Sequence, residues 1–142
     1  MKSMLVLLLF STVVSANIGE SKEELIKRYG DAKGSGDTLS FEKDGLRVVA
    51  TLWKGKCSMI MFWLIGEGDA PPQRKFTSEE TEAILSRNPA HSTYLPADPK
   101  FDKLRAKVRK SSDQKFIATT SPEMITIQSA EYNEARDDQP IK

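Results

Sequence analysis

The chain of 142 residues is 39% hydrophobic and 29% charged, which is typical of a folded globular protein and excludes a disordered one. It carries 21 basic and 20 acidic residues, so its near-neutral charge excludes a general electrostatic attraction to nucleic acid or to acidic membranes. With a single cysteine, Cys57, no internal disulfide can form, and the hydrophobic core alone must hold the fold.

Residues 1–16 are predicted to be a cleaved signal peptide. Lys2 precedes an apolar run from Met4 to Val14, and Ser15 and Ala16 supply the small residues of a cleavage site. The run is too short for a membrane anchor, and the leader has no cysteine that could carry a lipid. We therefore expect an exported, soluble protein of the periplasm or the cell exterior, with a formal net charge of zero after cleavage.

A short helix is predicted near the start of the mature chain. Ser21 and Glu24 form a capping box, in which the Ser21 hydroxyl accepts from the Glu24 amide and the Glu24 side chain reaches back. Gly30 ends this helix. Three apolar residues share one helical face: Leu25, Ile26 and Tyr29.

Alternating apolar and polar residues on both sides of Asp44-Gly45 predict a β-hairpin with a two-residue turn. Such a turn pairs Lys43 with Leu46. The same register then aligns the apolar residues on one face, so that turn and pattern agree. The expected apolar pairs are Phe41 with Val48 and Leu39 with Ala50.

The next segment, 57–65, predicts a strand with apolar residues on both faces. A two-residue turn before it would place Lys54 at positive φ, so we expect a three-residue loop with Gly55 in the left-handed region. That loop would place four residues on the core face with Val48: Ser58, Ile60, Phe62 and Leu64. It would leave on the opposite face Cys57, Met59, Met61 and Trp63, beside Val49 and Arg47.

A proline-containing connector over 66–75 leads to a second capping box, formed by Thr77 and Glu80. The helix that follows is expected to end at Asn88-Pro89, because the residue before a proline disfavours helical geometry. An irregular, proline-rich stretch then continues to residue 99.

Residues 103–109 alternate charged and apolar side chains, which predicts a half-buried strand; a helix through Phe101, Leu104 and Val108 is the alternative. As a strand, the segment presents four cations on one face: Lys103, Arg105, Lys107 and Arg109. This face could bind anionic lipid head groups, polysaccharide or an acidic protein, and an ordinary solvated face is the alternative. Nucleic acid is not an expected partner, because the protein is expected to be exported and the cations lack interleaved aromatic residues.

Residues 115–120 and 124–129 predict a closing hairpin, and 131–142 is expected to be a polar, frayed tail. Residues 17–130 then form one domain in which a capped helix followed by three strands occurs twice, a pattern that suggests a tandem repeat. We expect an α+β fold with two helices packed on one face of an antiparallel sheet of about six strands.

Two sets of short motifs resemble known protein families. The first is Ile18-Gly19-Glu20-Ser21, Glu24-Leu25 and Tyr29-Gly30, followed by a β-meander, and it resembles the β-lactamase-inhibitor-protein fold and the small lipoproteins of the outer-membrane barrel-assembly machinery. The second resembles short exported bacterial proteins of unassigned function, in Thr77-Ser78-Glu79-Glu80 through Asn88, Ser111-Ser112-Asp113, Ile125-Thr126-Ile127 and Glu131-Tyr132.

The resemblance implies a bacterial host and a non-enzymatic, protein-binding role. The chain lacks the lipid-attachment cysteine of the lipoproteins and the paired cysteines of the inhibitor. Neither membrane anchoring nor lactamase inhibition is therefore carried over.

No catalytic residue is assigned. Cys57 and His91 are the only thiol and the only imidazole, and nothing in their spacing brings them together as nucleophile and base. Ser112 and Lys115 fit the Ser-x-x-Lys pattern of penicillin-recognising enzymes, but at a polar turn and without the companion motifs. A small hydrolase that uses Cys57 or Ser112 is thus an alternative to a binding protein.

No metal or cofactor site is predicted either. One cysteine and one histidine cannot supply a zinc-binding set, and the paired aspartates lack the spacing of a calcium loop. Gly34-Ser35-Gly36 lacks the lysine and the strand-to-helix context of a phosphate-binding loop.

The second candidate surface is an apolar patch of Arg47, Met59, Met61 and Trp63. If the helices cover only one face of the sheet, this patch marks a partner site, where methionine adapts to irregular surfaces and Trp and Arg are frequent hot spots. If the second half of the chain folds over it, the same residues are core. We expect a binding module that contacts a partner protein or a second copy here; a structural protein of the bacterial envelope is a further alternative.

Overall fold

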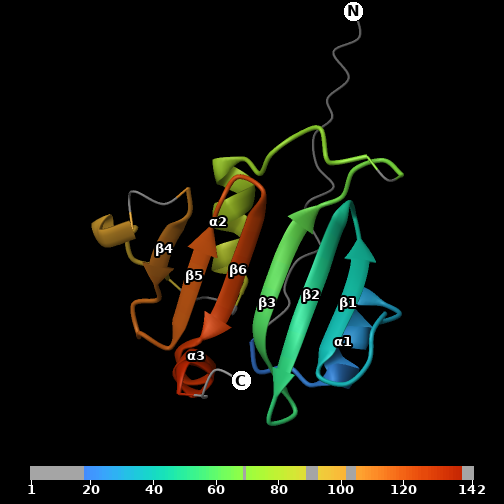
Figure 1. Ribbon diagram of the computed structural model, residues 1–142, viewed down its shortest axis with the longest axis horizontal. Helices are drawn as coiled ribbons and strands as arrows, with labels where there is room; N and C mark the ends of the chain where they lie inside the picture. The colour runs from blue at the N-terminus through green and yellow to red at the C-terminus, as the bar shows by residue number, and fades with distance from the viewer. Residues whose placement is uncertain (1–17, 69, 89–92, 102–104, 139–142) are drawn as a thin grey trace, which may run out of the picture.

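The computed structural model describes residues 18–68, 70–88, 93–101 and 105–138 of the chain (Figure 1). The predicted signal peptide lies outside these residues, as do His91 and Lys103. Among the described residues, no helix has the length and apolar character needed to cross a membrane.

Six antiparallel strands form one sheet in the order β1-β2-β3-β6-β5-β4 (Figure 1). The strands are β1 (Thr38–Lys43), β2 (Leu46–Trp53), β3 (Lys56–Leu64), β4 (Lys107–Lys110), β5 (Phe116–Thr120) and β6 (Met124–Ser129). Helices α1 (Lys22–Tyr29) and α2 (Ser78–Ser86) lie behind the sheet in Figure 1, whereas α3 (Ala130–Asp137) lies below the end of β6. The expected α+β class with a six-stranded antiparallel sheet is confirmed.

The two halves of the chain meet at the centre of the sheet, where β3 pairs with β6. Helix followed by three strands occurs twice in the element order, with a short 3-10 helix, η1 (Pro99–Phe101), before β4. Strands β1–β3 of the first half and β4–β6 of the second half are each adjacent in the sheet, and the β3–β6 pair joins the two sets into one continuous sheet.

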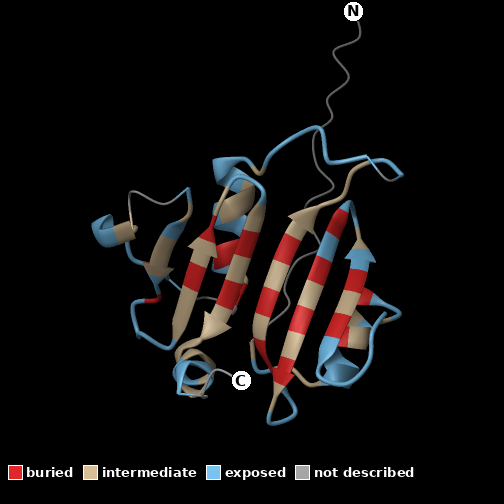
Figure 2. Ribbon diagram, in the orientation of Figure 1, coloured by how far each residue is buried: buried red, intermediate tan, exposed pale blue. Residues whose placement is uncertain are grey.

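The hydrophobic core lies between the sheet and helices α1 and α2. Buried residues alternate with half-buried or exposed ones along β2 and β3, so each strand turns every second side chain to the helices (Figure 2). The two helices bury Leu25, Tyr29, Ile84 and Leu85 against this face. The largest sheet residues that are completely buried in the core are Leu39, Phe41, Val48, Ile60, Phe62, Ile125 and Ile127.

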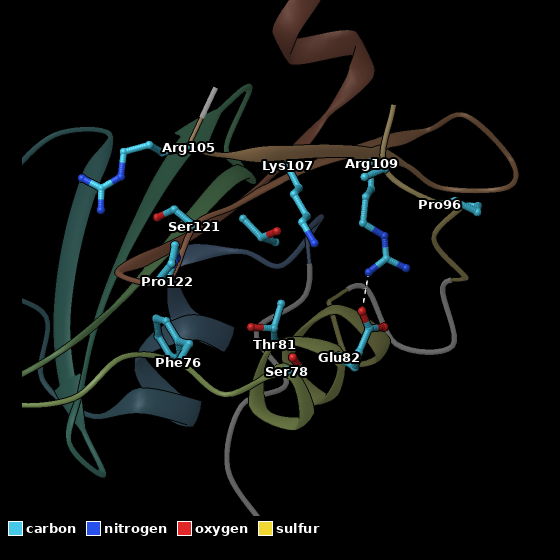
Figure 3. Close-up of a pocket in the computed structure, with 12 residues that line it drawn as sticks. Phe76, Ser78, Thr81, Glu82, Pro96, Arg105, Lys107, Arg109, Ser121 and Pro122 are labelled. Atoms are coloured by element: carbon cyan, nitrogen blue, oxygen red, sulfur yellow. Dashed lines mark hydrogen bonds and ion pairs between the residues drawn. The ribbon is translucent and has the colours of Figure 1, made fainter. Parts of the chain in front are cut away.

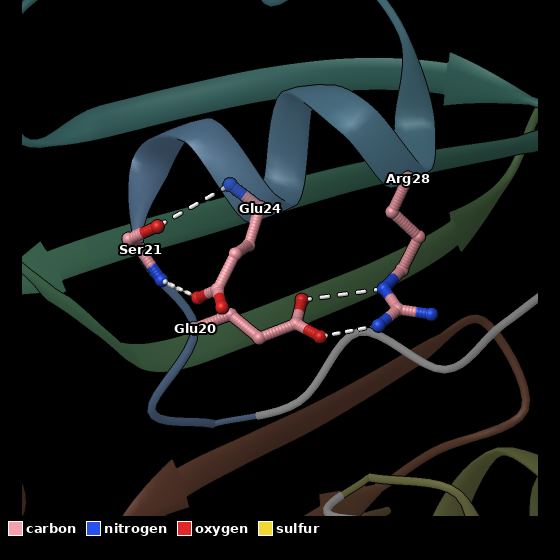
Figure 4. Close-up of polar contacts among 4 residues, drawn as sticks. All are labelled: Glu20, Ser21, Glu24 and Arg28. Atoms are coloured by element: carbon pink, nitrogen blue, oxygen red, sulfur yellow. Dashed lines mark hydrogen bonds and ion pairs between the residues drawn. The ribbon is translucent and has the colours of Figure 1, made fainter.

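The capping boxes predicted for the two helices are both confirmed. In α1 the Glu24 amide donates to Ser21 Oγ at 3.3 Å, and the Ser21 amide donates to Glu24 Oε2 at 2.7 Å (Figure 4). Glu20 accepts both from Arg28 and, through its backbone carbonyl, from the Cys57 amide at 2.7 Å. These contacts tie the N-terminus of α1 to its last turn and to the start of β3.

The first hairpin forms as predicted. Asp44 and Gly45 both take positive φ, at 51° and 79°, and Lys43 pairs with Leu46. A two-residue turn of this hand matches the twist of the flanking strands. The pairs Phe41 with Val48 and Leu39 with Ala50 follow in register.

The prediction of a three-residue loop between β2 and β3 is wrong. Lys54 and Gly55 form a two-residue turn, with φ of 52° and 75°, and Trp53 pairs with Lys56. The extra residue is instead Ser58, which forms a β-bulge between Cys57, the partner of Leu52, and the next pair along β3.

The bulge determines which residues of β3 face the core. Before it, Cys57 lies among core residues and is only 1% exposed, so its expected place on the opposite face is wrong. After it, Met59 pairs with Thr51, and Met59, Met61 and Trp63 alternate with the buried Ile60 and Phe62. The extra residue of the bulge thus produces the same register for this part of β3 as the expected longer loop.

In the second half of the chain, strand β4 is shorter than predicted and the β5–β6 hairpin forms as predicted. β4 runs over Lys107–Lys110, residues 105–106 precede it without strand structure, and 103–104 lie outside the described residues. The helical alternative is wrong at the four positions of β4. The closing hairpin of β5 and β6 is confirmed.

The expectation of a frayed tail from residue 131 is wrong, because α3 forms there. Ser129 caps it by accepting from the Tyr132 amide at 3.1 Å. The Tyr132 ring packs on Trp53 with 5.9 Å between centroids, and Lys54 lies 3.5 Å from Glu131. The described chain therefore has three helices where two were expected.

Candidate functional site

The face of the sheet turned away from α1 and α2, here called the open face, carries an apolar cluster: Val49, Met59, Met61, Trp63, Ile117 and Met124. None of these side chains is fully buried, in contrast to their neighbours along each strand. They form rows across the sheet, since Val49 pairs with Met61 and Trp63 pairs with Met124. The cluster thus spans the junction between the two halves of the chain.

The composition of the open face is unusual for the solvent side of a sheet. The chain has five methionines, of which Met1 and Met4 are in the predicted leader. The other three, Met59, Met61 and Met124, all belong to the open face. Large apolar residues concentrated on one half-exposed sheet face are typical of an interaction surface.

Charged side chains lie at the rim of the open face, away from its centre. Arg47, the partner of Trp63 on β2, is exposed, and its guanidinium donates to Glu42 Oε1 at 3.1 Å. Thr126, between Met61 of β3 and Thr119 of β5, continues the central row without a charge. The structure therefore brings Arg47, Met59, Met61 and Trp63 together on one face, as strand alternation predicts, and their binding role stays a prediction.

Cys57 is unsuited to nucleophilic catalysis. Burial raises the pKa of its thiol to about 12, and the negative charge of Glu20 adds to this effect. The Sγ atom donates to the carbonyl oxygen of Met59 at 3.6 Å. A thiol with this pKa stays protonated at neutral pH, whereas catalysis requires the thiolate.

Ser112 lies at the exposed turn between β4 and β5. Its neighbour Asp113 accepts from Ser111 Oγ at 2.6 Å and from the Lys115 amide at 3.1 Å, and the bond from Ser111 lowers the pKa of that carboxyl. These bonds shape the turn. Within the described chain, no base bonds to the Ser112 hydroxyl, and the Ser-x-x-Lys pattern does not begin a helix.

A cleft lies on the opposite side of the sheet, between α2 and the β4–β5 edge (Figure 3). Its volume is about 480 Å³, within the usual range for small-ligand sites. Lys107 pairs with Thr120 and Arg109 with Ala118, so both cations project on the helix side of β4. The walls consist of Phe76, Ser78, Thr81, Glu82, Pro96, Ala97, Arg105, Lys107, Arg109, Thr120, Ser121 and Pro122.

The expected row of four equivalent cations does not form within the described part of β4. Arg109 is a structural residue: it pairs with Glu82 and donates to the Leu95 carbonyl at 2.9 Å. Arg105 precedes β4, is 86% exposed and lies 3.8 Å from Glu123. Lys103 lies outside the described residues. Of the four predicted cations, Lys107 is therefore the described one that forms no ion pair with a described residue.

Sequence reasoning missed part of both sites. Met124 and Ile117 belong to the open face because β6 pairs with β3 and β5 pairs with β6. The alternation of side chains along the closing hairpin could have placed these two residues on one face, but not beside Met61. Thr81 of α2 and Thr120 of β5 both line the cleft, and no local sequence pattern links them. No group of three or more His, Cys, Asp or Glu that could hold a metal occurs in the described ranges.

No protein-family model matches the chain, and no curated protein and no solved structure matches it either. The resemblance to the inhibitor fold and to the assembly lipoproteins therefore stays a prediction.

Proposed function

We propose that the protein is a non-enzymatic binding module that engages a partner protein through the open face. The observation that carries this proposal is the half-buried cluster around Met61, on a sheet whose two core helices pack on the other side (Figure 1). A second protein would remove this apolar surface from water, which is the main driving force of protein association.

The partner that suits this surface is a folded protein with a charge-poor, apolar contact area. The central row of the open face, from Val49 through Met61 to Thr126, has no charge, and Arg47 at the rim is paired with Glu42. Interface cores are depleted of charge and enriched in Met, aromatic residues and Arg. An anionic membrane would instead require a set of uncompensated cations around the apolar cluster.

Export of the protein is part of this proposal. Residues 1–16 have the pattern of a signal peptide, and the resemblance noted above also suggests the periplasm or exterior of a bacterium. A partner is therefore expected among envelope or extracellular proteins.

Site-directed variants of the purified protein test the proposal. A partner isolated from the envelope fraction is titrated into protein labelled with ¹³C at the methionine methyl groups. We expect the signals of Met59, Met61 and Met124 to shift, and Met61→Asp to weaken binding by roughly 30-fold or more, as for a central hot spot. Met61→Gln is a milder change that is less disruptive to folding than Met61→Asp, and it should also weaken binding.

Thr38→Asp is the matched control. Thr38 is exposed on the same face of edge strand β1 and pairs with Thr51, outside the apolar cluster, so binding should change less than about twofold. A partner that binds folded Met61→Asp as tightly as the wild type contradicts the proposal. A concentration-dependent dimer that Met61→Asp abolishes would replace the partner with a second copy of this chain.

A further inference from the structure

We propose that the cleft between α2 and the β4–β5 edge binds a small carboxylate ligand that carries an apolar group. This site lies on the helix side of the sheet, away from the open face, and is independent of the function proposed above. The ligand class follows from a lysine that forms no ion pair with a described residue, a set of unpartnered hydroxyls and an apolar wall.

Lys107 supplies the cation. Figure 3 shows its side chain extending from β4 toward α2, across the cleft that it lines. Arg109 pairs with Glu82, and Arg105 faces Glu123. Lys107 forms no ion pair with any described residue, so an anion in the cleft would meet a free ammonium group.

Thr120 supplies a hydroxyl next to that ammonium. It is the cross-strand partner of Lys107, lines the cleft and is only 8% exposed. Its side chain makes no hydrogen bond within the described residues. The hydroxyl oxygen of Thr120 is not fully buried, so it can donate a hydrogen bond to a ligand oxygen in the cleft.

Further hydroxyls complete the polar side of the cleft. Ser78 and Thr81 of α2 line it and make no side-chain hydrogen bond with any described residue. Ser121 is already engaged, because its hydroxyl accepts from the Met124 amide at 3.1 Å and donates to the Met124 carbonyl at 3.2 Å. Free hydroxyls of α2 and β5 thus lie on both sides of the space that Lys107 overlooks.

The apolar wall and the charge balance restrict the ligand. Four lining residues have apolar side chains: Phe76, Pro96, Ala97 and Pro122. They suit an aromatic or aliphatic group attached to the anion. Lys107 forms no ion pair with a described residue, and Arg105 shares Glu123 with Lys75, so the cleft keeps an excess of positive charge that an anion would balance. The apolar wall favours a carboxylate with an attached apolar group over inorganic phosphate.

Calorimetric titration of the full chain with matched probes tests the proposal. N-acetyl-phenylalanine should bind saturably. Its neutral amide, which lacks the charge, and acetate, which lacks the apolar group, should each bind at least about tenfold more weakly, as expected for loss of a charge-assisted bond or of a buried ring. Inorganic phosphate should also bind more weakly.

Variants then locate the site. Lys107→Gln should weaken N-acetyl-phenylalanine binding by about tenfold or more, and Thr120→Val should weaken it by a smaller factor. Lys110→Gln is the matched control, since Lys110 lies on the same strand but on the other face of the sheet and should leave binding unchanged.

Several outcomes would overturn the proposal. They are the absence of saturable binding, equal binding of the neutral amide, phosphate binding as tight as that of the carboxylate, and binding that Lys107→Gln leaves intact. Circular dichroism of each variant confirms folding. Because Lys107 is exposed, its substitution should not affect stability enough to obscure the result.

Discussion

Alanine substitution at two neighbouring residues of β3 measures directly whether the open face is uncovered. Ile60 pairs with Ala50 and Ile127, and all three are fully buried. Met61, the next residue, pairs with Val49 and Thr126 on the other face, where all three are half-buried. The same backbone thus presents one side chain to the core and the next to solvent.

The two substitutions should differ severalfold in their effect on the free energy of unfolding. Ile60→Ala removes buried methyl groups from a tightly packed layer and should cost about 2–5 kcal/mol. Met61→Ala leaves no closed cavity and should cost roughly 1 kcal/mol or less. Both changes place alanine in the same central strand, and β-propensity differences span only about 1 kcal/mol, so a difference of several kcal/mol reports burial.

Urea denaturation followed by circular dichroism measures both values. With a slope of about 1–3 kcal/mol per molar urea, Ile60→Ala should lower the midpoint by about 1 M or more and Met61→Ala by only a few tenths. Equal losses for the two variants would refute the reasoning, because they would mean that Met61 is packed as tightly as Ile60. The binding role of the open face would then lose its structural basis.

Three further outcomes are expected. Because the pKa of Cys57 is raised to about 12, the folded state holds the thiol proton more tightly than the unfolded state does. The free energy of unfolding should therefore fall as the pH rises above about 9.0. Urea titrations at several pH values should show a smaller fall for Cys57→Ala. Tyr132→Ala removes the ring contact with Trp53 and should make α3 more susceptible to limited proteolysis, at a cost of about 0.5–1.5 kcal/mol. Ser111→Ala leaves the Phe116 amide without its 3.0 Å acceptor at a buried site and should lower thermal stability by about 1–3 kcal/mol.

The elements set by neighbouring residues were predictable. Asp44-Gly45 can occupy two successive positive-φ positions, and this local property specifies both the turn and the register of the first hairpin. Likewise, Ser21 and Thr77 each reach an amide three residues away, so their capping boxes form without help from the rest of the fold.

The errors involve local preferences that other contacts override. Lys54 accepts positive φ although lysine disfavours it, and the extra residue is accommodated at Ser58 inside the strand. This choice moves Cys57 from the predicted surface into the core, beside the N-terminal segment that bonds to its backbone. The polar tail becomes a helix because Tyr132 can pack on Trp53 of a distant strand.

The sequence by itself determined the α+β class, the capped helices, the hairpins and the concentration of Met59, Met61 and Trp63 on one side of a strand, since each depends on residues a few positions apart. The tertiary structure alone decided that β3 pairs with β6, which extends this side into the open face with Met124. It also decided that Lys107 and Thr120 line a cleft with α2. Pairing between distant segments depends on which apolar surfaces can be buried together, a condition that no short stretch of sequence contains.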